Sequence, residues 1–514
     1  MTAPSTDLDL NSTRVVLDRL ARSLSPAIKP PALSNHLILA SRGAVEAKYG
    51  QAAFRALDGA LGELARVSDG SLLYVDDPVG AAAVGVEPLD QTTRSAAWAT
   101  WLDSAAPAAS SVLLIGGPDL VPFGVARNPS DDDDGPLATE APLAGGRPLE
   151  PQRAVGRLPD GGDISYLLRL VRATTEAHAA ARAPRWTARL RAEAPTAIGY
   201  TASIWRNAAR VVYAAIDSPQ RLRMSPPLDH TAAPAITAPV FSPAYFNLHG
   251  LKDEAGWYGQ RDPLLAADYA AFPLALSPDQ LTAAARRRLV VFSAACYGAH
   301  IEGKSAANSM ALRLLDTHAA AFVGSTAVAY GGLAEPLQAT DQLALLFWQR
   351  LRGGLPLGEA LRQAKLDLIE EMQRRQGYVD TEDQKAVLSF VLYGDPSLRP
   401  FRGPSGAVAP PVPPAAAAPD RPHVPSLSLG APAIEPTAET LRRVERDLRA
   451  RLPDLGPMRI QVAPRLHRKG SGPVGPALTL TVVEDATQRP FRHLIRVTLN
   501  ADGAIAKLVM AHGC

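Results

Sequence analysis

Short apolar runs alternate with stretches of helical periodicity over most of this chain, and this alternation limits the fold more than any other feature. Strands that are apolar on both faces and separated by helices favour a parallel sheet with helices packed against it. We therefore predict an α/β fold: a mostly parallel sheet in two halves with flanking helices, plus a small C-terminal α+β domain. The predicted strands are 36–41, 71–77, 111–117, 196–201, 244–250, 289–296, 320–326 and 387–394. The predicted helices are 43–67, 90–106, 163–183, 203–215, 278–287, 306–317, 339–352 and 358–374.

A proline-rich stretch divides the chain. Residues 403–436 hold ten prolines in 34 positions and are expected to form an extended linker, because proline has no backbone N–H to donate. The part that follows has helical spacing at 437–452, then two strand-like stretches, and carries 13 Lys and Arg against 7 Asp and Glu. The predicted units are an N-terminal helical segment at 1–30, two α/β subdomains at 31–190 and 191–402, the linker at 403–436, and a small basic α+β domain at 437–514.

Composition and charge argue against several classes of protein. The 53 Lys and Arg nearly balance the 51 Asp and Glu, so net charge indicates neither a nucleic-acid nor a membrane partner. Only two cysteines are present, Cys296 and Cys514, which is too few for a disulfide framework. There is no leader-like pattern at the start and no run of about 18 apolar residues. We expect a cytoplasmic protein, and the richness in Ala, Arg and Pro is typical of a GC-rich bacterial genome.

Two predicted strands end in residues that are suited to nucleophilic catalysis. The run "VVFSAACYGAH" reaches Cys296, and "AYFNLHG" ends at His249, 47 residues earlier. In an open parallel sheet, ligands bind beyond the carboxyl ends of the strands. A lone cysteine is more often a packed core residue and a lone histidine more often structural, but together they suggest a Cys–His site. His300 lies on the departing loop and is not the expected partner.

Seven sequence blocks in order resemble the caspase-like superfamily of cysteine peptidases, and within it the gingipain-type branch. Ala295-Cys296-Tyr297-Gly298 keeps the A-C-x-G skeleton of the caspase signature, which has its histidine about 50 residues upstream. The blocks span about 110–400. They are "VLLIGGPDLVP", "PSDDDDGPLA", "AVGRLP", "FNLHG", "SAACYGAH", "NSMALRLLDTHAAAFVGSTAVAYGG" and "LYGDPSLRP".

The resemblance implies a caspase-like form of the predicted α/β fold and a cysteine endopeptidase whose catalytic subdomain is 191–402. Cys296 would be the nucleophile, His249 its catalytic partner, and the N–H groups of Gly250 and Cys296 the oxyanion hole. The substrate would be a protein or peptide, with no cofactor and no metal required.

The acidic loop at 129–136 bears on specificity. In gingipain-type enzymes an acidic residue of the Ser-Asp loop pairs with a basic P1 side chain, and the match here is Asp131. The resemblance thus implies cleavage after Arg, less surely Lys, with Tyr330 as a wall of the S1 pocket. This loop departs from the family by continuing with Asp132–Asp134 in place of an aromatic residue, so any of the four carboxylates is a candidate. A solvated acidic loop, a calcium site at Asp131–Asp134 and a purely packing role for Tyr330 are the alternatives.

Two rival functions stay open. The chain could be a catalytically inactive peptidase-like scaffold that binds a partner protein, or an unrelated α/β hydrolase or transferase that uses Cys296. The basic C-terminal domain is either a docking face for a partner protein or a solvated helix face, and it could restrain the enzyme. Arg specificity would also predict self-cleavage after Arg402 or Arg421.

Overall fold

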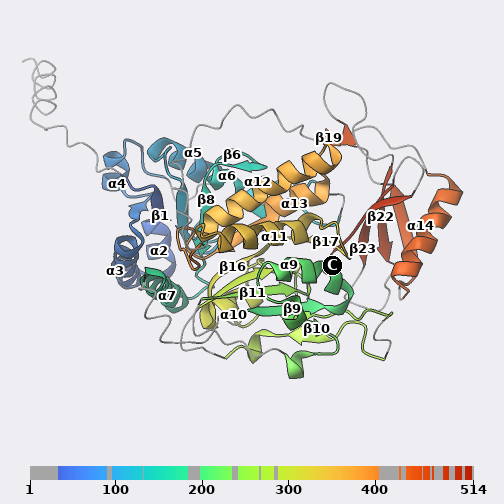
Figure 1. Ribbon diagram of the computed structural model, residues 1–514. Helices are drawn as coiled ribbons and strands as arrows, with labels where there is room; N and C mark the ends of the chain where they lie inside the picture. Colours follow the sequence, from blue (N-terminus) through green and yellow to red (C-terminus); the bar gives the residue numbers. More distant parts are fainter. Residues whose placement is uncertain are drawn as a thin grey trace, which may run out of the picture.

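The structure is a computed structural model, shown in Figure 1. None of its described helices is long and apolar enough to cross a membrane. The described residues are 33–89, 95–130, 132–182, 197–233, 241–264, 268–282, 288–403, 428–429, 436–453, 455–462, 466–467, 478–484, 493–499 and 504–511. The predicted N-terminal helical segment and nearly all of the predicted linker, including Arg421, lie outside them.

A ten-stranded sheet forms the centre of the molecule. Its order is β10-β9-β11-β15-β16-β18-β8-β3-β1-β2, and every neighbouring pair is parallel except β16 with β18. The two halves of the chain meet where β18 pairs with β8, so they share one sheet. This confirms the predicted fold class. The strands are β1 His36–Ala40, β2 Ser71–Tyr74, β3 Ser111–Ile115, β8 Ala154–Leu158, β9 Ile198–Ala202, β10 Arg223–Ser225, β11 Ser242–Asn247, β15 Leu289–Ser293, β16 Ala319–Ser325 and β18 Phe390–Tyr393.

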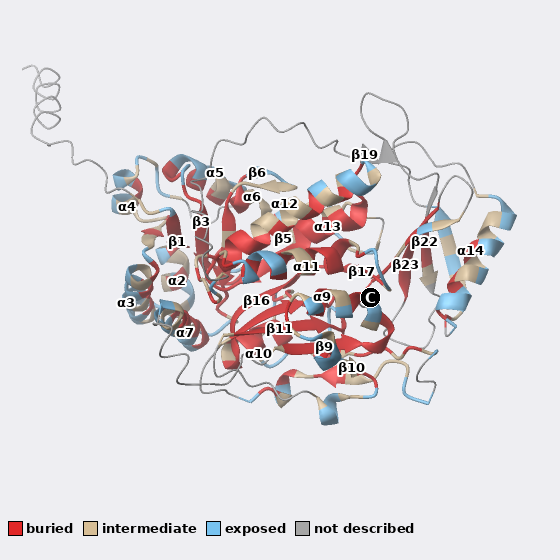
Figure 2. Ribbon diagram, in the orientation of Figure 1, coloured by how far each residue is buried: buried red, intermediate tan, exposed pale blue. Residues whose placement is uncertain are grey.

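Helices flank this sheet, and the inner strands between them are buried throughout (Figure 2). The predicted helix at 43–67 is two helices, because Gly50 has φ 86°, a left-handed conformation that interrupts the helical path. The helices are α2 Arg42–Tyr49, α3 Gln51–Ser68, α4 Pro78–Ala83, α5 Ser95–Ala105, α6 Ala141–Ala144, α7 Ile164–Arg182, α9 Arg206–Ala214, α10 Met310–Thr317, α11 Ala339–Arg352, α12 Leu357–Gln376 and α13 Thr381–Ser389.

Two other predicted elements differ from the structure. The run at 387–394 was expected to be one strand, but its first residues complete α13 and only Phe390–Tyr393 pair in the sheet. The helix predicted at 278–287 begins as a 3₁₀ turn, Pro278–Gln280, and residues 283–287 lie outside the described ones. Apolar composition is shared by strands and buried helices, so it did not separate them here.

Two sequence blocks of the resemblance serve the architecture. In "AVGRLP", buried Arg157 donates to Glu140 at 2.7 Å. In "LYGDPSLRP", buried Asp395 contacts His178 at 2.9 Å and His36 at 3.4 Å. Burial alone would raise the pKa of Asp395, but the two histidines outweigh it and hold the pKa well below its usual range. The first contact joins β8 to the residue before α6, and the contacts of Asp395 join β1, α7 and the chain after β18.

The C-terminal part is a helix packed on an antiparallel sheet, and this sheet includes a strand from the main body. Its order is β17-β24-β23-β22-β20, where β17 belongs to the segment after β16. Figure 1 shows these strands and α14 at one side of the molecule, next to β17. The elements are β17 Tyr330–Gly332, α14 Ala438–Arg451, β20 Met458–Val462, β22 Leu478–Glu484, β23 Leu494–Leu499 and β24 Ile505–Ala511. The short paired strands elsewhere are β4 Gly124–Ala126, β5 Leu137–Thr139, β6 Gly146–Arg147, β7 Glu150–Pro151, β12 His249–Gly250, β13 Trp257–Tyr258, β14 Leu274–Leu276, β19 Ser428–Leu429 and β21 Leu466–His467.

Candidate active site

The segments that carry Cys296 and His249 are in direct contact. Strands β11 and β15 are parallel neighbours, with Phe246 opposite Ser293, so both chains leave the sheet at the same edge. A Cβ placed on Gly250 would lie 2.2 Å from the carbonyl oxygen of Cys296. Real Cβ atoms essentially never approach so closely, so only glycine fits beside the cysteine without a shift of backbone.

Cys296 is buried, with 1% of its surface exposed, and its sulfur has backbone partners. The Ala329 N–H donates to Sγ at 3.1 Å, and Sγ lies 3.5 Å from the Ala329 carbonyl oxygen. The next residue, Tyr297, has φ 54°, a left-handed conformation that costs a residue with a side chain about 1–2 kcal/mol. Its N–H donates to the Ala327 carbonyl at 2.9 Å, which holds this turn in place. The thiol thus sits on a strained, anchored turn beside an N–H donor that favours negative charge on sulfur.

His249 is held from both its face and its edge. Its ring centroid lies 4.4 Å from that of Trp205 and 5.5 Å from that of Phe272. Its Nε2 is 2.8 Å from Oε1 of Gln260, and Nε2 of Gln260 is 2.8 Å from Nε2 of His493 in the C-terminal domain. Because an amide oxygen only accepts, Nε2 of His249 carries a proton, and in the neutral form of the ring the lone pair is on Nδ1.

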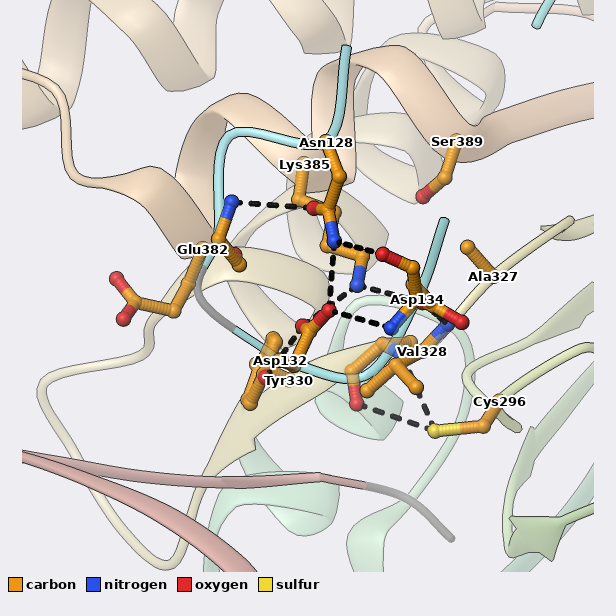
Figure 3. A network of polar contacts seen from close by, with 12 residues as sticks. Asn128, Asp132, Asp134, Cys296, Ala327, Val328, Tyr330, Glu382, Lys385 and Ser389 are labelled. Atoms are coloured by element: carbon orange, nitrogen blue, oxygen red, sulfur yellow. Dashed lines mark hydrogen bonds and ion pairs between the residues drawn. The ribbon is translucent and has the colours of Figure 1, made fainter. Parts of the chain in front are cut away.

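The acidic loop lies beside the cysteine and is bound by a buried lysine. Figure 3 shows Lys385 between Asp132 and Asp134, with Tyr330 and Cys296 close by. Nζ of Lys385 is 2.6 Å from a carboxylate oxygen of each aspartate. Tyr330 donates its hydroxyl hydrogen to Asp132 at 2.6 Å, and Tyr297 donates to Asp134 at 2.5 Å. Asp132 and Asp134 are therefore not part of a solvated face.

The backbone also ties this loop to the catalytic segment. Val328 N–H donates to Asp134 at 2.8 Å, one residue before the N–H that meets the sulfur of Cys296. Burial would raise the pKa of Asp134, but Lys385 and the hydrogen bonds from Tyr297 and Val328 together hold that pKa below its usual value. Asp134 thus remains a carboxylate at neutral pH.

The remaining candidates are distributed differently. Asp131, the expected S1 carboxylate, lies outside the described residues. A calcium ion at Asp131–Asp134 was one of the expected alternatives. In the structure the positive charge beside Asp132 and Asp134 comes from Lys385. Within the described parts of the chain, no group of three or more His, Cys, Asp or Glu side chains is arranged to hold a metal ion. The ring of His300 packs 6.3 Å from that of Tyr297, and burial lowers the pKa of this histidine.

Three polar neighbours of the site had no signal in the sequence. Lys385 comes 251 positions after Asp134, and His493 comes 233 positions after Gln260. Gln260 follows His249 by only 11 positions, but an amide has no place in the usual catalytic patterns. Sequence spacing identifies groups on neighbouring strand ends, whereas these contacts depend on how separate elements pack.

The fold and the site indicate the class of a cysteine-type peptidase. A mostly parallel α/β sheet places a buried cysteine next to the segment of a histidine, beyond adjacent strand ends. Residues 262–401 match the sequence model of Peptidase family C25, a family of gingipain-type cysteine peptidases, and this range includes Cys296 but not His249. The match supports the resemblance and the peptidase class over that segment.

Solved structures give a more distant comparison. The complex of Porphyromonas gingivalis RgpB pro- and mature domains is 11% identical, with 93% of this chain and 92% of that chain covered and a TM-score of 0.43. The crystal structure of the Arg specific cysteine proteinase gingipain R is 12% identical, with 93% and 90% covered and a TM-score of 0.43. No curated protein matches this chain.

Proposed function

We propose that this protein is a cysteine endopeptidase in which Cys296 is the nucleophile and His249 transfers the proton. The observation that carries the proposal is the contact of the Gly250 backbone with the Cys296 carbonyl, inside a chain segment similar to a peptidase family. A cysteine that only packs in the core would not need a strained turn at Tyr297. It would also not need an oriented imidazole at His249, the residue before Gly250. These features favour a catalytic pair over an inactive scaffold.

The chemistry follows from the positions of the protons. Nδ1 of His249 takes the thiol proton, and Sγ of Cys296 attacks the scissile carbonyl carbon. The N–H groups of Gly250 and Cys296 are proposed to bind the resulting oxyanion. The imidazolium then gives its proton to the leaving amine, which leaves a thioester on Cys296. Water attacks the thioester, gives one proton back through His249, and the acid product and free thiol are released.

We further propose that the S1 pocket prefers Arg over Lys. The acidic loop supports this, because Asp132 and Asp134 lie against the residues that flank the thiol. With Lys385 counted, these three charges sum to −1 (two carboxylates against one ammonium), and Asp131 adds a further carboxylate to the same loop. A planar guanidinium binds carboxylates through two parallel hydrogen bonds, which an ammonium cannot do.

The test is a panel of fluorogenic peptides that differ only at P1: Arg, Lys and citrulline. Citrulline has the shape of Arg without its charge, so it isolates the electrostatic contribution. We expect hydrolysis in the order Arg, Lys, citrulline, and its loss in Cys296→Ala and His249→Ala. Hydrolysis that survives Cys296→Ala would refute the nucleophile, and equal rates for Arg and citrulline would refute the acidic pocket. A cytoplasmic location and self-cleavage after Arg402 remain predictions, tested by fractionation and by sequencing of fragments.

A further inference from the structure

Strand β17 begins where the catalytic segment ends. Ala329 donates its N–H to the sulfur of Cys296, and Tyr330, the first residue of β17, follows directly. A chain that lies along β17 therefore passes close to the thiol. An exposed strand edge binds extended peptides, since its unpaired N–H and C=O groups complete a ladder with them.

One edge of β17 is already paired. β24 lies antiparallel to β17, with Tyr330 opposite Ala511 and Gly332 opposite Val509. In this sheet β17 is the end strand and β24 is its neighbour, so the C-terminal domain takes one of the two edges of β17. One edge pairs with one strand at a time, and a substrate peptide and β24 cannot both use it.

The contact is apolar and buried as well as hydrogen-bonded. Val509 and Ala511 belong to the same hydrophobic cluster as Cys296 and Tyr330. A second cluster joins Trp205, which packs against His249, to the inner side chains of the C-terminal domain. Side chains of the domain thus lie in the clusters that hold Cys296 and Trp205, and Cys296 and His249 expose only 1% and 2% of their surfaces.

Buried charges fasten the domain to α13. Lys507, on β24, contacts Asp380 and lies 3.4 Å from a carboxylate oxygen of Asp383. Arg496, on β23, pairs with Glu382. Burial alone would lower the pKa of Lys507, but Asp380 and Asp383 outweigh it and raise that pKa, so the residue is an ammonium at neutral pH. The same helix, α13, carries Lys385, which contacts the acidic loop. Docking of the C-terminal domain and ordering of the proposed S1 region therefore both involve α13.

We infer that the C-terminal domain is an autoinhibitory cap, in which β24 occupies the strand position of the substrate and must leave β17 before a peptide can bind. This inference rests on the proposed function in one respect: the peptide that competes with β24 for β17 is taken to be a substrate. The occlusion of Cys296 is a separate claim with its own measurement. Gln260 contacts His249 and donates a hydrogen bond to His493 of the C-terminal domain. The cap is therefore linked to the proposed catalytic histidine through one intervening side chain.

The test weakens the cap in the full chain without touching the peptidase residues. Lys507→Glu sets a fourth negative charge against Asp380, Glu382 and Asp383. Arg446→Glu, on the exposed face of α14, makes the same charge change away from the interface and is the matched control. All chains carry Cys514→Ser, so that Cys296 is the one thiol. Two rates are measured: alkylation of Cys296 by iodoacetamide, followed by intact mass, and hydrolysis of the P1-Arg peptide.

We expect Lys507→Glu to raise both rates at least about tenfold, since breaking a buried ion pair shifts an equilibrium by that much or more. Arg446→Glu should match the wild type in both. Faster alkylation without hydrolysis in any chain would support the cap and refute the peptidase. Wild-type hydrolysis with alkylation unchanged by Lys507→Glu would support the peptidase and overturn the cap. An equal gain in Arg446→Glu would also overturn it.

A milder variant covers the case in which Lys507→Glu does not fold. Lys507→Gln removes the charge but keeps the length of the side chain, and circular dichroism reports whether it folds. It should give a smaller rise in Cys296 alkylation than Lys507→Glu, in the same direction. Hydrogen exchange on the wild-type chain adds an independent measurement. The amides of Tyr330–Gly332 should exchange at the same slow rate as those of β24, because both are exposed by one opening event. Rapid exchange at these amides would overturn the cap.

Discussion

Removal of the Lys385 ammonium should destabilise the protein in a way that depends on pH. Lys385 is 1% exposed and lies 2.6 Å from both Asp132 and Asp134. Lys385→Met keeps the apolar length of the side chain and leaves two buried carboxylates without their cation. The loss of one partner of a buried ion pair costs about 3–5 kcal/mol. At a few degrees per kcal/mol, the unfolding temperature should fall by on the order of 10 °C at pH 7.5.

The pH dependence follows from Asp134. In the wild type its lowered pKa means that its stabilising contribution is present above pH 4 and is lost only as the pH falls through that low pKa. Without Lys385, burial raises the pKa of Asp134, so the carboxyl group takes up a proton in mild acid and the penalty shrinks. The difference between Lys385→Met and the wild type should therefore be smaller at pH 4.5 than at pH 7.5.

The assay is thermal unfolding followed by circular dichroism at both pH values. Lys252→Met, at an exposed loop lysine, is the control and should change the unfolding temperature little. Adding Asp132→Asn and Asp134→Asn to Lys385→Met removes the uncompensated charges and should recover part of the loss. An equal loss at both pH values, or no recovery in the triple variant, would refute the argument from charge.

Two further predictions concern Gly250 and Asp341. Gly250→Ala should separate the segments of Cys296 and His249, because its Cβ would lie 2.2 Å from the Cys296 carbonyl oxygen, and peptide hydrolysis should fall at least tenfold. Gly62→Ala, which meets nothing within 4 Å, should leave hydrolysis unchanged. Burial raises the pKa of Asp341 from 3.8 to about 7, so this residue removes stability as the pH rises from 4 to 7, by up to ~4 kcal/mol. In urea unfolding, the free energy of unfolding of Asp341→Asn should rise relative to that of the wild type over this pH range. A difference between the two that does not change with pH would contradict the raised pKa of Asp341.

Local sequence pattern predicted most of the central sheet because most of its strands are short apolar runs between helices. The strands β8 and β10, which contain Arg157 and Arg223, were not predicted. The predicted runs at 36–41, 111–117, 289–296 and 320–326 all lie in the ten-stranded sheet. The predictions were wrong where local pattern is ambiguous. An apolar stretch at 387–394 suits both a buried helix and a strand, and Gly50 divides a helix whose apolar spacing runs on through it.

The candidate dyad was accessible from the sequence for a related reason. Parallel strands place their carboxyl ends at one edge, so Cys296 and His249 could be paired once both were assigned to strand ends. Whether they form the active site stays a proposal, as do the roles of Gly250 in the oxyanion hole and of Asp131 and Tyr330 in S1.

What the sequence determined by itself was the class of fold, which follows from periodicity along the chain. The candidate pair of Cys296 and His249 came from the predicted strand ends together with the resemblance. What the tertiary structure decided was the state of the site. Lys385 meets Asp132 across 253 positions, and β24 pairs with a strand that precedes it by about 180 residues. Such contacts arise from the packing of buried faces and the pairing of buried charges, neither of which leaves a periodic signal. That is why the pairing of the C-terminal domain with β17, next to the residue that contacts Cys296, could not be predicted from local pattern.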